Sequence, residues 1–398
     1  MLKALADLCN EMKNEFYSDI VPFWTDVTIN PENDEFWSTI SNDLRQRSSS
    51  PKSVINFTRL LWSYASWYRF DGDPRFLKFA DKIYNILKDH FWDPENQGVF
   101  WSLDDQYQVL DDKKRVYGHS FFIYSMSEYY AASKDPKALE LAQKTFYLLE
   151  DKISDREYMG YFETFNRDWS IASDLRLSDK DMNEKKSMNS HLHIMEAYTN
   201  LYRVWPDPKV KEKLYELLHI FTEYIIDPVE KRFKLFFDEK WECKSPYTSY
   251  GHDIEGSWLL WETIEVLDDV ELQKNMKPLV IQMAQRVLET GFDQDGGLFY
   301  EGKGKEIVDS DKHWWPQAEA IVGFINAWQL TENPEYAEMA IRCWEFTKAY
   351  IIDRQHGEWF WKVSRDRVVY MDTPKVTDWK GPYHNSRACM EIIKRLSS

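Results

Sequence analysis

Cysteine and long apolar runs are scarce in this sequence, and each scarcity argues against a class of protein. The four cysteines lie far apart and form no C-x-x-C pair, which excludes a disulfide framework and a zinc knuckle: they are Cys9, Cys243, Cys343 and Cys389. No stretch approaches the roughly 18 consecutive apolar residues of a membrane span, and the first residues alternate charged with apolar side chains instead of forming a secretion signal. We therefore expect a protein of the reducing cytoplasm with no membrane partner.

Positive charge is scarce as well. The 398 residues include 50 Lys and Arg against 67 Asp and Glu, for a net charge of -17, and no run of Lys and Arg exceeds three residues. This balance repels phosphate backbones and argues against nucleic acid as a partner. Aromatic residues, in contrast, make up 16% of the chain and include 18 Trp. Most of them must fill the core, but flat aromatic faces also suit the apolar faces of sugar rings.

A phrase of helix, turn and helix recurs along the chain, at residues 67–87, 129–149, 201–221 and 327–347. In each copy an Asp or Asn precedes a Pro at the start of the second helix, where the side chain caps the helix and the missing N–H of Pro costs nothing. These pairs are Asp73-Pro74, Asp135-Pro136, Asp207-Pro208 and Asn333-Pro334. A fifth copy, residues 261–288, keeps the helical period but lacks the Asp-Pro start.

A segment rich in glycine and aromatic residues follows each second helix, and its alternating pattern predicts a short β-hairpin. The first helices are expected to start near Asn56, Tyr117, Asn189, His252, Trp315 and Pro382, at separations of 61 to 72 residues. Helices at residues 2–20 and 385–396 complete a sixth pair. We therefore predict an all-α fold, an (α/α)6 barrel of six helical hairpins with short β-hairpins in its loops, as a single domain over residues 1–398. An open solenoid of the same units is the alternative.

Unusual polar residues gather early in the first helices. If these helices are parallel, their N-terminal ends meet at one face of the barrel. Six of the nine histidines share this position, which predicts a functional pocket: they are His119, His191, His193, His252, His313 and His384. Two of them repeat one pattern, His193-x-x-Glu196 and His252-x-x-Glu255, in which a carboxylate on the same helix face can orient the imidazole. A buried ion pair without a catalytic role is the structural alternative.

His191 is a weaker candidate than His193, because the two face roughly opposite sides of a helix and at most one lines the pocket. The same geometry makes them a poor chelating pair, so we predict no metal, although His and Glu could hold one. Motifs for a serine or cysteine nucleophile, a phosphate loop and a dinucleotide are all missing. Imidazoles near helix N-termini favour proton abstraction next to a carbonyl, with redelivery to the same carbon from the opposite face.

Four separated motifs carry a family resemblance: KSMNSHLHIMEAYTNLYRV, SYGHDIEGSWLL, HWWPQAEA and DWKGPYHNSRAC. Taken in this order, they strongly resemble the cellobiose 2-epimerases of the N-acylglucosamine 2-epimerase superfamily, and the resemblance runs over nearly the whole chain. It implies an (α/α)6 barrel that converts the reducing-end glucose of a β-1,4-linked disaccharide to mannose, with cellobiose, lactose or mannobiose as substrate. It also implies that neither a metal nor a nucleotide cofactor is required.

The resemblance also implies roles for individual residues. His252 and His384 would exchange the C2 proton through a cis-enediolate, while His193 would help to open the sugar ring. Arg59 would stabilise the enediolate oxygens, and Glu255 would support His252.

Further residues would bind the sugar: Tyr117, Asp181, Asn189, Trp315, Glu319 and Trp379. Among them, Tyr117, Asn189 and Glu319 would donate or accept hydrogen bonds at the reducing-end sugar. Trp315 and Trp379 would stack on sugar rings, with Trp379 holding the non-reducing unit, and Asp181 would help to hold the intermediate. We expect a monomer.

Three other functions are compatible with the sequence. An aldose–ketose isomerase on the same barrel would move the proton from C2 to C1. A glycoside hydrolase would work with two carboxylates, for which Asp253, Glu255 and Glu319 are candidates. A carbohydrate-binding protein would hold sugars on its Trp faces without turnover.

Overall fold

The computed structural model describes residues 1–397, which divide into two compact units. Unit 1 comprises Met1–Ser49, Asp227–Phe233 and Pro246–Ser398, and unit 2 comprises Ser50–Ile226 and Lys234–Ser245. Both units are built from α-helical hairpins with short strand pairs between them, as expected. The single domain stays a prediction.

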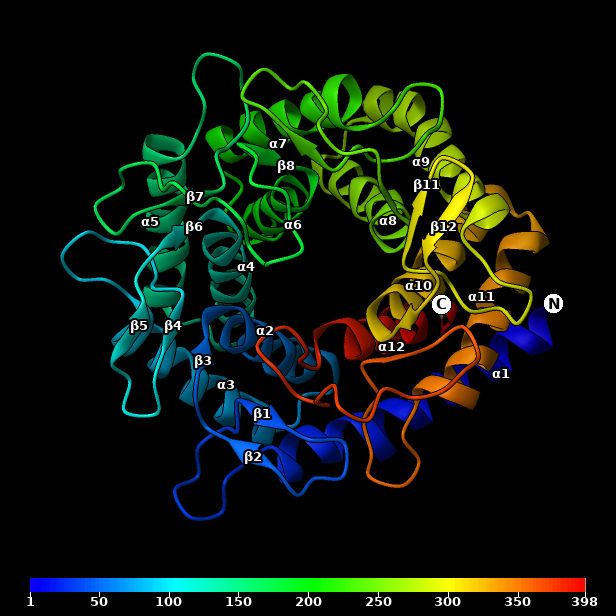
Figure 1. Cartoon of the computed structure of the whole chain (residues 1–398), viewed down its shortest axis with the longest axis horizontal. Coiled ribbons are helices and arrows are strands. Elements are labelled where there is room, and N and C mark those ends of the chain that lie inside the picture. The colour runs from blue at the N-terminus through cyan, green and yellow to red at the C-terminus, as the bar shows by residue number, and fades with distance from the viewer. Residues whose placement is uncertain (398) are drawn as a thin grey trace. The chain divides into compact units, whose positions relative to one another are not determined.

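Unit 2 contains three helical hairpins. Its helices are α2 (Val54–Asp71), α3 (Pro74–Ile86), α4 (Val116–Ser133), α5 (Pro136–Lys152), α6 (Met188–Val204) and α7 (Pro208–Ile220), with π-helical turns at Leu87–Phe91 and Phe221–Ile225. Its strands are β3 (Lys52–Ser53), β4 (Ser102–Leu103), β5 (Val109–Asp111), β6 (Lys114–Arg115), β7 (Thr164–Phe165), β8 (Lys186–Ser187) and β9 (Phe236–Phe237). The first helices α2, α4 and α6 pack side by side in that order, and α3, α5 and α7 each pack on their own first helix (Figure 1).

Unit 1 repeats this plan. Its helices are α1 (Leu2–Glu15), α8 (Tyr250–Leu267), α9 (Val270–Thr290), α10 (Trp314–Thr331), α11 (Pro334–Phe346) and α12 (Tyr383–Leu396), with π-helical turns at Phe16–Ile20, Phe23–Val27 and Thr347–Ile351. Its strands are β1 (Thr39–Ile40), β2 (Arg47–Ser48), β10 (Thr248–Ser249), β11 (Glu301–Lys303), β12 (Glu306–Asp309), β13 (Lys312–His313) and β14 (Lys362–Val363). Helix α10 packs between α8 and α12, and α1 packs on α12 as the partner that the sequence predicts for the C-terminal helix.

The predicted helix caps are confirmed. Asp73, Asp135, Asp207 and Asn333 each accept a hydrogen bond from the backbone N–H two residues further on, with Pro in the first helical turn. The second helix of the copy without the Asp-Pro start, α9, has no Pro in its first turn but is capped by Asp269 in the same way. Each first helix begins within two residues of its expected start.

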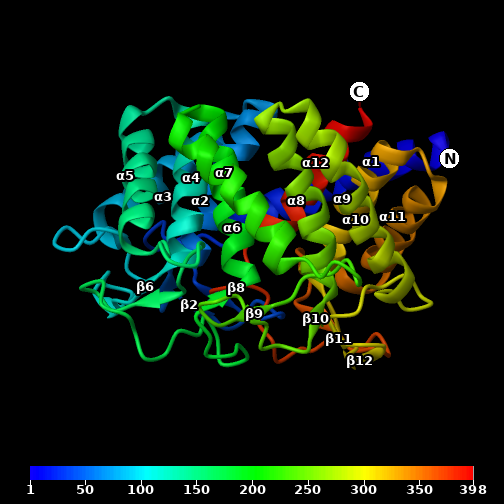
Figure 2. The ribbon, with the colours of Figure 1, turned by 90° about the horizontal axis from the view of Figure 1, so that it is seen from above.

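Short strands fix where the first helices begin. In β3, β6, β8, β10 and β13 the last strand residue is followed directly by the first residue of a helix, and each of these strands pairs with an antiparallel neighbour. The strands β6, β8 and β9 lie at one end of α4 and α6 in unit 2, and β10, β11 and β12 lie at one end of α8 and α10 in unit 1 (Figure 2). Side chains in the first helical turns are therefore held at the end where the strands lie.

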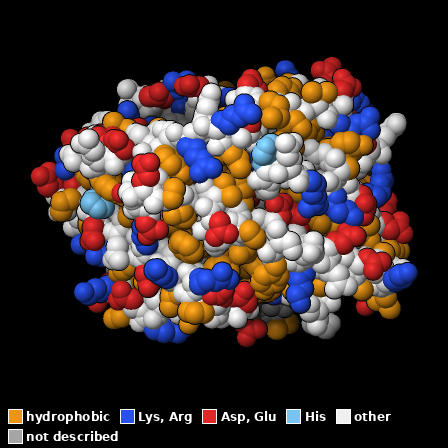
Figure 3. All heavy atoms as spheres, turned by 90° about the horizontal axis from the view of Figure 1, so that it is seen from below, with side chains coloured by type: hydrophobic (Ala, Val, Ile, Leu, Met, Phe, Trp, Pro, Cys, Tyr) orange, Lys and Arg blue, Asp and Glu red, His pale blue; other side chains and the backbone are white. Residues whose placement is uncertain are grey.

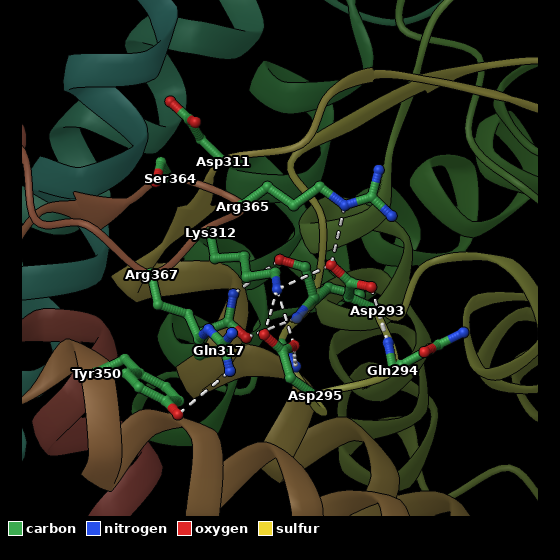
Figure 4. Close-up of polar contacts among 12 residues, drawn as sticks. Asp293, Gln294, Asp295, Asp311, Lys312, Gln317, Tyr350, Ser364, Arg365 and Arg367 are labelled. Atoms are coloured by element: carbon green, nitrogen blue, oxygen red, sulfur yellow. Dashed lines mark hydrogen bonds and ion pairs between the residues drawn. The ribbon is translucent and has the colours of Figure 1, made fainter.

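Buried lysines anchor the loops that follow the second helices. Lys114 Nζ lies 2.9 Å from Asp93, and Lys186 Nζ lies 2.7 Å from Asp155, in both cases just ahead of a first helix. In unit 1, the fully buried Lys312 Nζ lies 2.8 Å from Asp295 and 3.1 Å from Asp293 (Figure 4). A buried ammonium needs such partners, because an unpaired charge in the interior costs several kcal/mol, about 3 to 5 when one partner is removed. These pairs hold strand, loop and helix start together.

On the face drawn in Figure 3, acidic and basic side chains are interspersed with apolar ones. Within residues 1–397, no helix combines the length and the apolar character that crossing a bilayer requires.

Candidate active site

In unit 1, four charged or titratable side chains from three helices meet. They are Glu255 on α8, Glu319 on α10, and His384 and Arg387 on α12. His384 Nδ1 lies 2.7 Å from Glu319 Oε1 and 4.0 Å from Glu255 Oε1. Arg387 Nη2 donates to both carboxylates, at 2.8 Å from each Oε1. All four side chains are buried, so their interactions are little screened by water.

Aromatic rings hold the arginine in place. The Arg387 guanidinium lies 4.8 Å from the ring centroid of Trp258 and 4.3 Å from that of Tyr383. Trp258 Nε1 also donates to Glu319 Oε2 at 3.1 Å. Glu255, Glu319 and His384 lie close enough to share a metal ion. Arg387 already supplies both carboxylates with positive charge, which fits a metal-independent site.

A second histidine of unit 1 lies beside a tryptophan. His252, on the first turn of α8, is half-buried, and its Nδ1 lies 2.7 Å from Ser249 Oγ. The Trp315 ring lies 4.7 Å from the His252 ring and 5.6 Å from the His384 ring, measured between centroids. Trp315 therefore contacts both imidazoles. The support of His252 by Glu255, which the family resemblance implies, stays a prediction. The structure shows the Ser249 hydroxyl beside His252 and pairs Glu255 with Arg387.

This arrangement suits proton transfer. An imidazole whose Nδ1 is held by a hydrogen-bond partner has a fixed orientation, and Nε2 on the opposite side of the ring is the atom that exchanges a proton. His384 is held by a carboxylate and His252 by a hydroxyl. Trp379, the other predicted stacking residue, is half-buried in the loop ahead of α12.

In unit 2, predicted site residues from three first helices come together. Arg59 on α2 donates from Nη2 to the hydroxyl of Tyr117 on α4, at 3.0 Å. His193 on α6 lies edge-on to Tyr117, with 5.1 Å between ring centroids. The Phe121 ring packs on both the Arg59 guanidinium, at 4.6 Å, and the His193 ring, at 4.9 Å. The predicted pairing with Glu196 forms, since His193 Nδ1 lies 2.8 Å from Glu196 Oε2.

Two further predicted residues of unit 2 flank the start of α6. Asn189 lies in the first turn, and within residues 1–397 its buried Oδ1 accepts no hydrogen bond. Asp181 lies in the loop ahead of β8, where its carboxylate accepts hydrogen bonds from the backbone N–H and hydroxyl of Ser178, at 2.9 and 3.1 Å. Burial raises the pKa of Asp181 above its usual value.

Two histidines counted toward the predicted pocket are structural instead. His119 Nδ1 lies 2.7 Å from the Arg115 carbonyl oxygen, and its Nε2 accepts from the backbone N–H of Val99 at 3.0 Å. His191 makes the same contacts, at 2.7 Å to Ser187 O and 3.0 Å from Tyr161 N. Both ring nitrogens are occupied, and burial lowers the pKa of each imidazole to about 3. Their inclusion among the pocket residues was therefore wrong, while the preference for His193 over His191 agrees with these contacts.

The helix position explains this mistake. His119, His191, Asp253 and Gln317 are each the fourth residue of a first helix. Each accepts a hydrogen bond from a backbone N–H of the preceding loop. The shared position therefore reflects a repeated loop anchor rather than a shared catalytic role.

Arg387 is the main residue that the sequence reasoning missed. It follows His384 by three residues, so both lie on one face of α12, and it stands inside one of the four motifs that carry the resemblance. The three-residue spacing from His384 is the feature of the sequence that could have identified Arg387 as a site residue.

Comparisons with known proteins show the family and the fold. Residues 36–388 match the model of the N-acylglucosamine 2-epimerase family. A cellobiose 2-epimerase of Bacteroides fragilis is 41% identical, over 97% of this chain and 98% of that protein. One of Dictyoglomus turgidum is 35% identical, over 98% and 99%.

A solved cellobiose 2-epimerase structure from Bacillus thermoamylovorans matches with a TM-score of 0.92 at 35% identity, covering 98% of this chain and 100% of that one. A solved D-mannose isomerase shares the fold, with a TM-score of 0.83 at 20% identity. These similarities confirm the predicted (α/α)6 fold class. The chain belongs to the N-acylglucosamine 2-epimerase family.

Proposed function

We propose that the protein is a cellobiose 2-epimerase, which reversibly epimerises C2 of the reducing-end glucose in β-1,4-linked disaccharides. The similarity to cellobiose 2-epimerases supports this function. The observation that carries it is the pair of imidazoles in unit 1, His252 and His384, which both contact Trp315 and are each held at Nδ1.

In the proposed reaction, one imidazole removes the C2 proton of the open-chain sugar through its Nε2. The electrons of the C2–H bond form the C1–C2 double bond of an enediolate, and negative charge passes to the carbonyl oxygen. The other imidazole then donates its proton to C2 from the opposite face. The carbonyl re-forms, and the configuration at C2 is inverted.

Glu319 and Arg387 set the electrostatics of this step. When His384 accepts a proton, the imidazolium remains paired with the Glu319 carboxylate. The positive charge of Arg387 favours the carboxylate form of Glu319, the form that can hold an imidazolium. Glu255, which also binds Arg387, takes part in the same charge balance.

The residues of unit 2 are assigned the accompanying steps that the family resemblance implies. His193, oriented by Glu196, handles the proton that moves when the sugar ring opens. Arg59 stabilises the enediolate oxygens by its positive charge. Tyr117 and Asn189 form hydrogen bonds with the reducing-end sugar, as Glu319 does in unit 1, and Asp181 helps to hold the intermediate. Trp315 and Trp379 stack on the sugar rings.

The hydrolase alternative conflicts with the contacts of its candidate carboxylates. A glycoside hydrolase needs one protonated carboxylic acid to protonate the leaving group. Glu255 and Glu319 both bind Arg387, which favours their ionised forms. Asp253 is fully buried and accepts from the Phe233 backbone N–H at 2.7 Å, as a loop anchor. An isomerase needs a base on one face only, so two held imidazoles favour epimerisation.

The test is incubation of EDTA-treated protein with cellobiose in D2O, followed by NMR. We expect glucosyl-mannose with deuterium at C2 and no free glucose. Accumulation of glucosyl-fructose would support the isomerase instead, and free glucose would support the hydrolase. If the sugar binds but is not converted, the protein is a carbohydrate-binding protein instead of an enzyme acting on this sugar.

A further inference from the structure

Glu163 joins the starts of two first helices in unit 2. It lies directly ahead of β7 and is only 4% exposed. Its Oε1 accepts from the backbone N–H of Ser187 at 2.8 Å, and its Oε2 accepts from the Ser190 hydroxyl at 2.5 Å. Its own backbone carbonyl oxygen accepts from the N–H of Val116 at 3.0 Å. One residue thus contacts the first turns of both α4 and α6.

The residues that Glu163 contacts are neighbours of predicted site residues. Val116 directly precedes Tyr117 on α4. On α6, Ser187 is the N-cap, and its hydroxyl accepts from the Ser190 N–H at 3.1 Å, which closes a small hydrogen-bonded ring with Glu163. Asn189 lies between these serines, and His193 lies three residues after Ser190 on the same helix face. The Glu163 carboxylate therefore binds the turn of α6 that carries Asn189 and that precedes His193.

A carboxyl group is energetically unfavourable at the buried position of Glu163. Burial, together with a smaller contribution from the nearby charge of Asp181, raises the pKa of Glu163 to about 8. Within residues 1–397, Glu163 forms no ion pair, and the adjacent Lys186 binds Asp155. A packed apolar side chain would avoid this cost, so the hydrogen bonds to Ser187 and Ser190 are what the carboxyl group contributes.

We propose that Glu163 is a positioning residue of the site in unit 2. It holds the first turn of α6, and with it Asn189 and His193, in register with the start of α4 and Tyr117. The kinetic consequence rests on the proposed epimerase function, whereas the positional consequence does not.

The test compares three variants with the wild-type chain. Glu163→Ala removes both side-chain hydrogen bonds. Glu163→Gln keeps an acceptor for Ser187 and places an amide against the Ser190 hydroxyl, so it should restore the contacts. Glu150→Gln is the matched control, because Glu150 also binds α6, accepting from Tyr198 at 2.7 Å, but far from its first turn.

Hydrogen exchange of the Ser187 and Ser190 amides reports the positional role without any activity. We expect Glu163→Ala to accelerate exchange at these amides about tenfold or more, since each lost hydrogen bond weakens the turn. Exchange in Glu163→Gln and Glu150→Gln should stay near that of the wild type. If Glu163→Ala fails to fold, Ser190→Ala, which removes one partner, should accelerate exchange at the Ser187 amide.

Kinetics on cellobiose test the catalytic consequence, at a temperature where circular dichroism shows each variant folded. We expect Glu163→Ala to lower kcat about tenfold or more, and Glu163→Gln and Glu150→Gln to stay within about threefold of the wild type. Unchanged exchange and kcat in Glu163→Ala would overturn the proposal, as would a Glu163→Gln variant as impaired as Glu163→Ala. An inactive wild type would instead refute the proposed function, and exchange would still decide the role of Glu163.

Discussion

His384 and Glu319 form a buried pair, with 2.7 Å between the imidazole Nδ1 and the carboxylate Oε1. The same carboxylate oxygen accepts from Arg387 at 2.8 Å. Glu319 thus binds one permanent cation and one group that becomes a cation when it takes a proton. The pair orients the imidazole and favours its protonated form, which is the form that must appear once during each proposed turnover.

Replacement of Glu319 by Gln tests this pair. We expect Glu319→Gln to lower kcat at least about tenfold and to shift to lower pH the limb of the kcat profile that His384 sets, because an imidazole without a neighbouring negative charge has a lower pKa. That limb is the acidic one for the epimer from which His384 removes the proton and the basic one for the other epimer. Steady-state kinetics between pH 5 and pH 9 measure both effects. Glu345→Gln, on the exposed face of α11, serves as the control. A folded Glu319→Gln enzyme with unchanged kcat and pH profile would contradict the assigned role.

Loss of either proposed base should stop epimerisation. It should still allow exchange of the C2 hydrogen with solvent in one of the two epimers. We expect His252→Ala and His384→Ala to lose epimerase turnover, because redelivery from one face is missing. Each remaining imidazole should still exchange the C2 hydrogen of one epimer with D2O, and the two variants should act on opposite epimers. NMR of cellobiose and glucosyl-mannose in D2O separates these reactions. Epimerisation at the wild-type rate in either variant would rule out the two-base mechanism.

Trp379 is expected to contribute more to disaccharides than to glucose. One stacking surface contributes about 0.5 to 1.5 kcal/mol beyond the area that it buries. Trp379→Ala should therefore raise KM for cellobiose, with a smaller change for glucose, whereas Trp379→Phe should keep part of the difference. Equal losses on both sugars would show that Trp379 does not hold the non-reducing unit.

His119 is expected to make the folded protein less stable as the pH falls below 6.5. Its pKa lies near 3 in the folded protein, below the usual 6.5, so its stabilising contribution is complete above pH 6.5 and declines as the pH falls toward 3. When the pH falls from 7 to 5, one imidazole with this lowered pKa reduces the free energy of unfolding by about 2 kcal/mol. His119→Gln should remove this contribution, while that of His191 remains, and should keep the contacts, because Gln317 anchors its own loop with an amide.

Denaturant unfolding at pH 7 and pH 5 measures this effect as a difference between variants. The exposed His219→Gln is the matched control and should follow the wild type. If His119→Gln loses as much stability on acidification as the wild type, the buried neutral imidazole is not the cause.

The helical repeat was predictable because its signals are local. Asp73 and Asn333 cap helices through contacts that span two residues, and such contacts are visible in sequence. The pairing of His193 with Glu196 was predictable for the same reason.

Contacts between helices were not predictable in this way. Ser249 as the partner of His252, and Arg387 between Glu255 and Glu319, depend on side-chain orientation and helix packing. His119 was misjudged because an anchor of the preceding loop and a catalytic base occupy similar helix positions. Only the Val99 N–H at its Nε2 distinguishes the two roles.

The direct junction of strand and helix has a consequence for how such an enzyme can diversify. Ser53, Arg115 and Ser249 are each both the last residue of a paired strand and the residue before a helix. Beyond these strands, the tips at residues 104–108 and 304–305 are largely exposed. Insertions or exchanges at the tips can therefore change what the loops offer a substrate without shifting the first helical turns, so that substrate range and proton chemistry can evolve separately.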